Sequence, residues 1–349
     1  MGYLFSPLVI STLISICLGY PAFILAEKLN LLDVPGSAPH KTHALPTPLA
    51  GGILVVFSFA LMIVLFPQWL NREMLAVFGG AAIVFFFGVW DDRKGLSAGP
   101  KLIGQLIASA VLISCGVQVY FMSIFSTAGY ISPLLAQLLN ILVTLFWLIG
   151  ITNALNMIDS MDGIVAGLAI IASLFFWGAA TVAGQYVIAF WSAVLLGTSV
   201  GLYFWNKTRS RFFLGDSGSQ TIGFLLASFG ILYNPLNRDP ASSWIVPIML
   251  LAIPIFDTSL VVLSRLRRKQ PIGSGRRDHT YHRLTALGFS PKFAVVITHV
   301  AALTVGCLAF WTLYLPPSIA LTIFFLTLLC GLMLLLWLER KPSLDDSFE

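Results

Sequence analysis

Residues 134–183 have the sequence LLAQLLNILVTLFWLIGITNALNMIDSMDGIVAGLAIIASLFFWGAATVA. Two apolar runs, each about the 20 residues that a membrane-spanning helix needs, flank a short polar stretch. The rest of the chain is similar, because 58% of the 349 residues are hydrophobic and 10% are charged, against about 25% in a typical soluble domain. One soluble core of this size cannot bury 27 Phe and 9 Trp. The composition therefore predicts a polytopic membrane protein and excludes a soluble enzyme, a disordered tail protein and a disulfide scaffold.

Apolar runs long enough to span a bilayer recur along the chain, with no internal repeat and no low-complexity linker. We expect an all-α fold, a polytopic membrane helical bundle of about eleven transmembrane helices that forms a single domain over residues 1–349. The first run has neither a basic start nor a small-residue cleavage site, so it is expected to stay attached as a span. The predicted spans are 7–26, 49–67, 74–90, 102–120, 134–152, 163–183, 186–205, 218–234, 243–263, 293–313 and 317–338.

Basic residues predict the orientation of these spans. With the N-terminus outside, eighteen of the twenty Lys and Arg residues fall on cytoplasmic segments, as the positive-inside rule requires. The sequence therefore predicts an N-out, C-in topology, and the net charge of +5 indicates orientation rather than binding to nucleic acid. Thirteen of the fifteen acidic residues fall on the same side, several beside glycines and asparagines. This clustering predicts an active-site cleft that faces the cytoplasm.

The third predicted span ends at two adjacent carboxylates, Asp91 and Asp92, in the sequence GVWDDRKG. Adjacent carboxylates repel each other, so one is readily left as a proton acceptor or given to a cation. A solvated helix end is the ordinary explanation of such a pair when it occurs alone. The sequence does not distinguish the two carboxylates, so either is a candidate catalytic base.

A second polar motif follows the fifth predicted span, where Asn153, Asn156, Asp159 and Asp162 are three residues apart. On a helix, such residues are neighbours, so we expect one polar strip that continues out of the span. No Lys or Arg occurs in residues 141–184 to neutralise the carboxylates. Oxygen ligands without nearby cations suit a hard metal ion such as Mg²⁺, and a purely structural strip would be costly at a membrane boundary.

The third motif is FLGDSGS, in which Asp216 follows a short run of cationic residues. The backbone N–H groups around Asp216 are expected to hold an anion while its carboxylate holds a metal ion. The letters GDSGS also occur in trypsin-like proteases, but those are soluble β-barrels that need a separate His and Asp, which nothing here supplies. A presenilin-like aspartyl protease needs a Gly where this chain has Phe213. Both protease classes are therefore excluded.

The 29-residue loop after the ninth predicted span contains eight of the twenty basic residues. Orientation and attraction to lipid headgroups explain its first cations, but not the sequence RRDHTYHR. His279, His282 and Arg283 are candidates for contact with phosphate oxygens, Arg283 through its two-pronged guanidinium group. Two histidines without a nearby Cys or third His do not make a zinc site. Within the spans, Asp257 is a functional or helix-pairing candidate, and His299 is interpreted as a hydrogen-bonded packing residue.

Together these segments resemble the polyprenyl-phosphate N-acetylhexosamine-1-phosphate transferase superfamily. The resemblance extends from about Leu32 to Leu284, and the motifs occur in the family's order. Each motif alone is weak, but five ordered motifs on one predicted face are a strong indication. They are DVPGSAPHKTHALPTPLAGG at 33–52, DD at 91–92, NALNMIDSMDG at 153–163, FLGDSGS at 213–219 and HTYHRL at 279–284.

This resemblance implies an integral protein of the bacterial cytoplasmic membrane with Mg²⁺, or Mn²⁺, as its cofactor. It implies that a sugar 1-phosphate passes from a UDP-N-acetylhexosamine to the lipid undecaprenyl phosphate, or another polyprenyl phosphate, with release of UMP. The catalytic residues that we predict are Asp91, Asp92, Asp159 and Asp162. The predicted metal ligands are Asp216 and Asp159. The predicted substrate-binding residues are Lys41, Asn153, Asn156, Asn206, Phe213, His279, His282 and Arg283.

The chain departs from the family pattern at three places. His40 stands where Arg is frequent, Leu49 where a basic residue or Met is frequent, and Tyr281 where a histidine completes the usual His-x-His-His. The ending His-Arg-Leu resembles the branch that uses UDP-N-acetylglucosamine. We therefore expect transfer of N-acetylglucosamine 1-phosphate, or that of a close relative, and no use of a muramoyl-pentapeptide donor.

The main alternative is a transporter or flippase of anionic lipid-linked substrates. Transporters usually place charges near the membrane midplane on broken helices, often in repeated halves. Here the acids cluster at one boundary and no repeat is visible. An inert scaffold would have little reason to keep unpaired acids. The sequence favours an enzyme and leaves open whether it is a homodimer.

Overall fold

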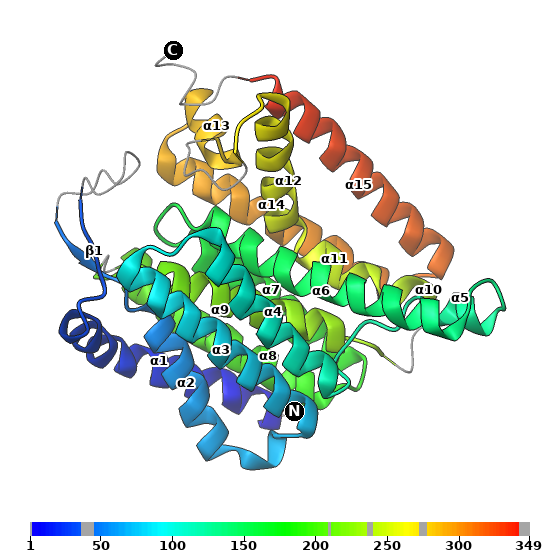
Figure 1. Cartoon of the computed structure of the whole chain (residues 1–349), viewed down its shortest axis with the longest axis horizontal. Coiled ribbons are helices and arrows are strands. Elements are labelled where there is room, and N and C mark those ends of the chain that lie inside the picture. Colours follow the sequence, from blue (N-terminus) through cyan, green and yellow to red (C-terminus); the bar gives the residue numbers. More distant parts are fainter. Residues whose placement is uncertain (1, 36–44, 209–210, 236–239, 272–277, 342–349) are drawn as a thin grey trace.

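The computed structural model describes residues 2–35, 45–208, 211–235, 240–271 and 278–341 (Figure 1). The prediction of an all-α fold is confirmed, since only β1 (Leu32–Asp33) and β2 (Thr47–Pro48) form an antiparallel pair among the described residues. The helices are α1 (Gly2–Lys28), α2 (Gly51–Leu65), a 3₁₀ turn (Pro67–Trp69), α3 (Arg72–Lys94), α4 (Ala98–Ser114), α5 (Ser123–Thr127), α6 (Pro133–Ile158), α7 (Ile164–Val182), α8 (Tyr186–Tyr203), a π-helical turn (Phe204–Thr208), α9 (Gly215–Leu232), α10 (Pro240–Ser243), α11 (Ile245–Leu250), α12 (Ala252–Arg267), α13 (Thr280–Ala286), α14 (Pro291–Thr312) and α15 (Pro317–Glu339).

Seven of the described helical segments are long and apolar enough to cross a membrane. These are α1 from Phe5 onward, α3, α6, α7, α8 with its extension to Lys207, α14 and α15, while α2 and α4 are shorter apolar helices. Each of the eleven predicted ranges overlaps a helix, but the ninth is divided between α11 and α12. Pro254 explains the division, because it has no N–H to donate to Leu250 and its ring crowds that carbonyl. The number of spans and their orientation stay predictions.

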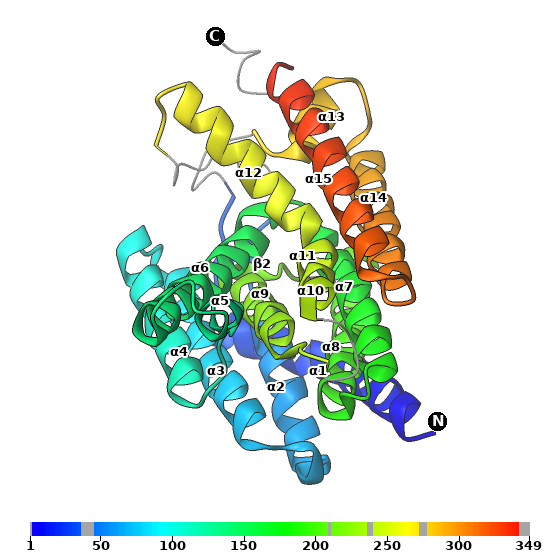
Figure 2. The ribbon, with the colours of Figure 1, turned by 90° about the vertical axis from the view of Figure 1, so that its right-hand side faces the viewer.

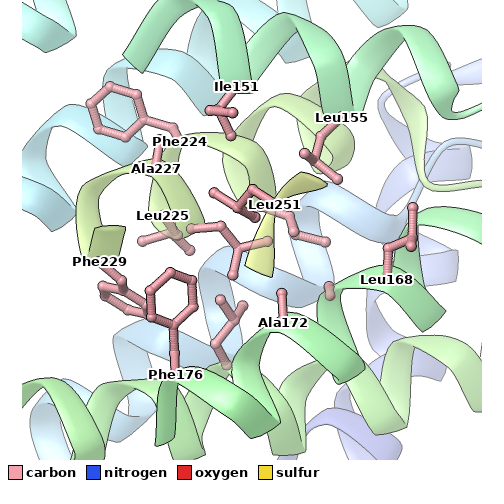
Figure 3. Close-up of a cluster of buried hydrophobic side chains, with 14 of the residues drawn as sticks. Ile151, Leu155, Leu168, Ala172, Phe176, Phe224, Leu225, Ala227, Phe229 and Leu251 are labelled. Carbon is pink, nitrogen blue, oxygen red and sulfur yellow. The ribbon is translucent and has the colours of Figure 1, made fainter. Parts of the chain in front are cut away.

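Helix α9 lies at the centre of the bundle and packs against α2, α3 and α6 (Figure 2). All of its residues from Ser217 to Gly230 are buried, and the small residues among them allow the neighbouring helices to approach closely. A Cβ at Gly223 would lie 2.9 Å from the Cα of Thr152 in α6. Side chains from α6, α7 and α9 fill the space between these helices, together with Leu251 (Figure 3).

The polar ends of several helices meet at one end of the bundle. The carboxylate of Asp92 at the end of α3 accepts N–H groups from the start of α9. Asn206, which follows α8, accepts the N–H of Gly163 at the start of α7. Helices α12, α14 and α15 lie together beside this bundle, with α13 near their upper end in Figure 1. Between α12 and α15, Leu260, Leu335 and Leu338 form a small apolar cluster separate from the main core.

Candidate active site

Asp92 closes the N-terminus of α9. Its carboxylate accepts the backbone N–H groups of Asp216 at 2.7 Å and Ser217 at 3.1 Å, where the positive end of the helix dipole favours a negative charge. Gly215 has a φ of +74°, and a Cβ there would lie 2.8 Å from the same carboxylate, so the turn requires glycine. The N–H groups near Gly215, Ser217 and Gly218 were predicted to hold an anion. For Ser217 this is wrong, because Asp92 already accepts its N–H, and for the other two it stays a prediction.

Lys101, in the first turn of α4, lies between two carboxylates. Its Nζ is 2.6 Å from Oδ2 of Asp216, and it also forms an ion pair with Asp91. Asp91 is 6% exposed and accepts the N–H of Leu96 as well. The sequence-based prediction left out Lys101, because its charge was assigned to orientation. A clue was present, since Lys101 follows the aspartate pair by one short turn of chain, which returns it to the same end of the bundle.

Asn156 and Asn153 lie one helical turn apart on α6. The amide of Asn156 donates to Oδ1 of Asp216 at 2.9 Å, so it orients that carboxylate. Asn153 exchanges two hydrogen bonds with Gln105 of α4, at 2.8 and 3.2 Å, and Gln105 also donates to Gln220 of α9 at 3.0 Å. The structure thus places Asn156 beside the carboxylates and Asn153 one turn deeper, in a network of amides.

The predicted helical strip is wrong in its second half. Helix α6 ends at Ile158, and the dihedral angles of Asp159 (φ −76°, ψ 71°) are not helical. Gly163 has a φ of +81°, which the chain needs in order to turn directly into α7. Asp159 and Asp162 therefore lie in the turn between two helices. The three-residue spacing was correct for Asn153 and Asn156 but could not show where the helix stops.

Asp159 nevertheless belongs electrostatically with the other carboxylates. Burial raises the pKa of its carboxyl group well above the ordinary value, and the negative charges of Asp216, Asp92 and Asp162 raise it further. We call Asp91, Asp92, Asp159 and Asp216 the acidic cluster. Its carboxylates outnumber the cation Lys101 that bridges two of them.

The donor atoms of the acidic cluster fit a hard divalent cation. Carboxylate oxygens are the ligands that Mg²⁺ prefers, and Asp216 is already oriented by Asn156. Within the described ranges, no three His, Cys, Asp or Glu side chains converge closely enough to hold a metal ion by themselves. Mg²⁺ does not require such a cage, since one or two carboxylates together with substrate phosphates usually hold it. Asp216 and Asp159 are the residues that would hold it here.

Two further predicted site residues, Asn206 and Phe213, lie at this end of the bundle, and a third is not among the described residues. Asn206 is buried, with Oδ1 2.6 Å from a backbone nitrogen at the start of α7 and Nδ2 3.1 Å from the carbonyl of Phe212. The half-buried Phe213 donates its N–H to Pro48 at 2.9 Å. Asn206 therefore holds two loops together, and Phe213 joins the start of α9 to the segment before α2. Lys41 lies outside the described residues.

The segment 278–283, which we call the histidine loop, is held by buried charges. Nδ1 of His279 is 2.8 Å from Asp257, whose second oxygen accepts the N–H of Thr280 at 2.7 Å. Arg265 binds Asp278 through two bonds of 2.8 and 2.9 Å. Attraction to lipid headgroups was expected to help explain Arg265, but that interpretation is wrong, because the side chain is buried in this ion pair. Its contribution to orientation stays a prediction. Burial lowers the pKa of His279, but Asp257 and Asp278 raise it more, so the net shift is upward.

The prediction that Arg283 binds phosphate through a two-pronged contact is also wrong. Its side chain is 0% exposed, and its N–H groups donate to protein oxygens at the end of α15 and in the neighbouring loop. Arg283 therefore anchors α13 to the last turn of α15. Its acceptors are Oγ of Ser264 (2.7 Å) and the carbonyls of Asp278 (3.2 Å), Leu338 (2.9 Å), Glu339 (3.2 Å) and Lys341 (2.8 Å).

Tyr281 connects the histidine loop with the turn between α6 and α7 that contains Asp159 and Asp162, which we call the acidic turn. Its hydroxyl oxygen is 2.6 Å from Nε2 of His282 and 3.5 Å from the carbonyl of Ser160. Ser160 follows Asp159 directly, so the two charged regions are in contact at this point. Tyr281, one of the three residues that depart from the family pattern, thus joins them.

The fold and the site together define a polytopic α-helical membrane protein with the acidic cluster at one end of the bundle and the histidine loop in contact with the turn that follows α6. Comparison with known proteins identifies its family. The model of glycosyl transferase family 4 matches residues 74–234, which contain the whole acidic cluster. The chain belongs to this family, and the resemblance seen in its motifs is confirmed.

Curated relatives extend the similarity beyond the matched segment. A probable undecaprenyl-phosphate N-acetylglucosaminyl 1-phosphate transferase of Bacillus subtilis is 30% identical over 79% of this chain and 75% of its own length. A decaprenyl-phosphate N-acetylglucosaminephosphotransferase of Mycobacterium tuberculosis is 30% identical over 83% of this chain and 77% of its own. The undecaprenyl-phosphate alpha-N-acetylglucosaminyl 1-phosphate transferase of Escherichia coli K12 is 28% identical over 86% and 82%.

Proposed function

We propose that this protein transfers N-acetylglucosamine 1-phosphate from UDP-N-acetylglucosamine to a polyprenyl phosphate and releases UMP. The observation that carries the proposal is the acidic cluster, in which Lys101 bridges two carboxylates. It lies in a chain whose relatives are named as undecaprenyl- or decaprenyl-phosphate N-acetylglucosamine-phosphate transferases. No observation favours the transporter alternative.

The chemistry of this reaction explains the composition of the site. Both substrates carry phosphates, which repel each other, so the site must supply positive charge while it brings them together. When bound, Mg²⁺ would neutralise the diphosphate and the leaving nucleotide. Asp216 and Asp159 would hold that ion, and Lys101 would exchange one carboxylate for a phosphate. Both oxygens of Asp92 accept N–H groups of α9, whereas one oxygen of Asp91 pairs with Lys101, which would exchange it for a phosphate. We therefore assign Asp91 as the base that acts on the lipid phosphate.

The choice of donor is supported by the names of the relatives and no longer by a phosphate contact of Arg283. Arg283 cannot distinguish diphosphates while its guanidinium is buried in backbone contacts, so it no longer supports a small sugar. The printed names of the relatives support N-acetylglucosamine instead. Tyr281, in place of a histidine, is consistent with a donor other than the muramoyl pentapeptide.

We also infer that the site faces the cytoplasm of a bacterial inner membrane, which the distribution of Lys and Arg supports. A single cysteine at Ser97, just before α4, would report this in a chain whose four native cysteines are replaced. An impermeant reagent added outside intact cells should not label it. Labelling from outside would contradict the proposed orientation.

The decisive experiment combines purified protein with Mg²⁺, undecaprenyl phosphate and a panel of labelled UDP-sugars, followed by extraction of lipid. We expect labelled lipid from UDP-N-acetylglucosamine and none from the muramoyl-pentapeptide donor. Product from the pentapeptide donor alone would overturn the choice of donor and leave the reaction class intact. No lipid product from any sugar would overturn the proposed function.

A further inference from the structure

Asp257 is an acidic residue inside α12 that the proposed reaction has not used. Its side chain is 1% exposed, and both of its oxygens have partners at the start of α13. One oxygen is 2.8 Å from Nδ1 of His279, and the other accepts the N–H of Thr280 at 2.7 Å. One carboxylate thus holds the imidazole ring and the backbone that follows it, so neither can turn without the other.

The charges around His279 explain why this partner is a carboxylate. A buried carboxylate in a membrane helix is costly unless a cation compensates it. Of the described residues whose charges act on the ring, Asp257 and Asp278 are acidic and Arg265 is basic. This set is neutral only when the ring of His279 also carries a proton. An asparagine could still accept the N–H of Thr280 with its oxygen, but its NH₂ group would have to donate to Nδ1, which requires an uncharged imidazole ring.

We propose that Asp257 is a positioning residue, which fixes His279 through Nδ1 and leaves Nε2–H for an anionic phosphate oxygen of the nucleotide donor. The substrate part of this proposal rests on the proposed function, whereas the control of His279 does not. The rings of Tyr281 and His282 also pack near His279, with centroids 6.4 and 5.9 Å away. Neither of these two rings supplies a negative charge at neutral pH, so Asp257 and Asp278 are the acidic groups that act on it.

Nuclear magnetic resonance tests this control directly, because the chain has only five histidines to label with ¹⁵N. The His279 signal is assigned by its loss in His279→Gln. In Asp257→Asn we expect the pKa of His279 to fall by at least about one unit, the usual effect of removing a contacting charge. The fall of kcat/KM at high pH should move to lower pH by the same amount, because a protonated ring is required.

Glu339→Gln is the matched control. Glu339 is also a buried carboxylate, but its side chain pairs with Arg267 and not with a histidine. This variant should keep the wild-type pKa of His279 and the wild-type pH profile. Asp257→Glu, which keeps the charge, should restore most of the pKa that Asp257→Asn loses.

Three results would overturn the proposal. The first is an unchanged pKa of His279 in folded Asp257→Asn. The second is a further loss of activity when Asp257→Asn is added to His279→Gln, since a residue that acts through His279 has nothing left to lose there. The third is an Asp257→Asn protein that does not fold although His279→Gln does. If His279 titrates as expected but no UDP-sugar reacts, the proposed function fails while the control of His279 stands.

Discussion

In the acidic cluster two carboxylates share Lys101, whereas in the histidine loop Asp278 and His279 each have a buried partner of opposite charge. In the first region the carboxylates outnumber the lysine that bridges two of them, so a further cation would stabilise their charged forms. In the second region the charges of Asp278 and His279 are balanced by Arg265 and Asp257. We infer that carboxylates without enough cations form the part of the site that would bind metal or substrate. Buried pairs of opposite charge instead hold a loop in position.

The largest effect that would test this comparison is expected from Asp216→Asn. The change keeps the shape of the side chain but removes a charge from the region where charge is in excess. Loss of a direct metal ligand should cost at least several kcal/mol in the transition state, about a thousandfold or more in rate. Formation of labelled lipid at saturating Mg²⁺ measures this loss.

Ser228→Ala provides the control on the same helix. The hydroxyl of Ser228 is buried and bonds the carbonyl of Phe224 at 2.7 Å, which a helix tolerates losing. It should keep near-normal activity. Activity within tenfold of wild type in Asp216→Asn would refute the assignment of Asp216 to the metal.

A smaller effect is expected from Lys101→Met. Lys101 contacts a carboxylate assigned to the metal, and the loss of such a partner typically costs about 10- to 100-fold in activity. Because Lys101 also competes with a cation for Asp216, the Mg²⁺ concentration that gives half-maximal activity should fall while the maximal rate drops. A titration of activity with Mg²⁺ separates the two quantities.

Lys94→Met, an exposed lysine at the end of α3, is the matched control and should leave both quantities unchanged. An increase in the Mg²⁺ requirement of Lys101→Met would mean that Lys101 supports the metal rather than competing with it. The excess of negative charge would then be a weaker guide to the site than we infer.

In the histidine loop, Arg283→Met should change stability rather than substrate binding. It removes a buried cation and leaves several backbone carbonyls without a donor, so the free energy of unfolding should fall by at least about 3 kcal/mol. Arg93→Met is the control, because Arg93 is an exposed arginine at the end of α3 whose loss should cost less than about 1 kcal/mol. Denaturation in detergent measures both.

Kinetics then separate the two roles that Arg283 has been given. At a temperature where Arg283→Met is folded, its KM for the UDP-sugar should stay near the wild-type value. A large increase in KM without loss of stability would restore the prediction that Arg283 contacts phosphate.

These two regions also differ in how well the sequence predicted them. Hydrophobic runs located the helices, and the interpretation of His299 as a packing residue is confirmed by its 3.1 Å contact with the carbonyl of Ile164. The motifs identified the members of the acidic cluster, because acidic residues that have no Lys or Arg near them in the sequence can be recognised within a single segment. What they could not show is pairing across segments. Lys101 and Asp216 are far apart in the chain, and so are Arg283 and the end of α15.

Helix ends were the other gap. The spacing of Asn153 to Asp162 fits a helix throughout, yet the turn at Gly163 stops it at Ile158. The spacing of polar residues cannot predict such a turn, because part of its cause lies in another segment. There Asn206 accepts the N–H of Gly163. Local pattern thus predicts which residues are polar and which are apolar, while the positions of the polar groups depend on contacts between helices.

The smallest effect is expected where the two regions touch. Tyr281→Phe removes only the hydroxyl that is 2.6 Å from His282 and near the carbonyl of Ser160, and one hydrogen bond contributes about 0.5–1.5 kcal/mol, or roughly two- to twelvefold in rate. Because Tyr281 joins a balanced region to an unbalanced one, we expect the loss in kcat rather than in stability, since the histidine loop keeps its buried anchors. Tyr281→His, which restores the family residue, should lose less than Tyr281→Phe if an imidazole can make the same bond. Wild-type kcat in Tyr281→Phe would show that the contact with the acidic turn is incidental, and that the two regions act without a direct link through this side chain.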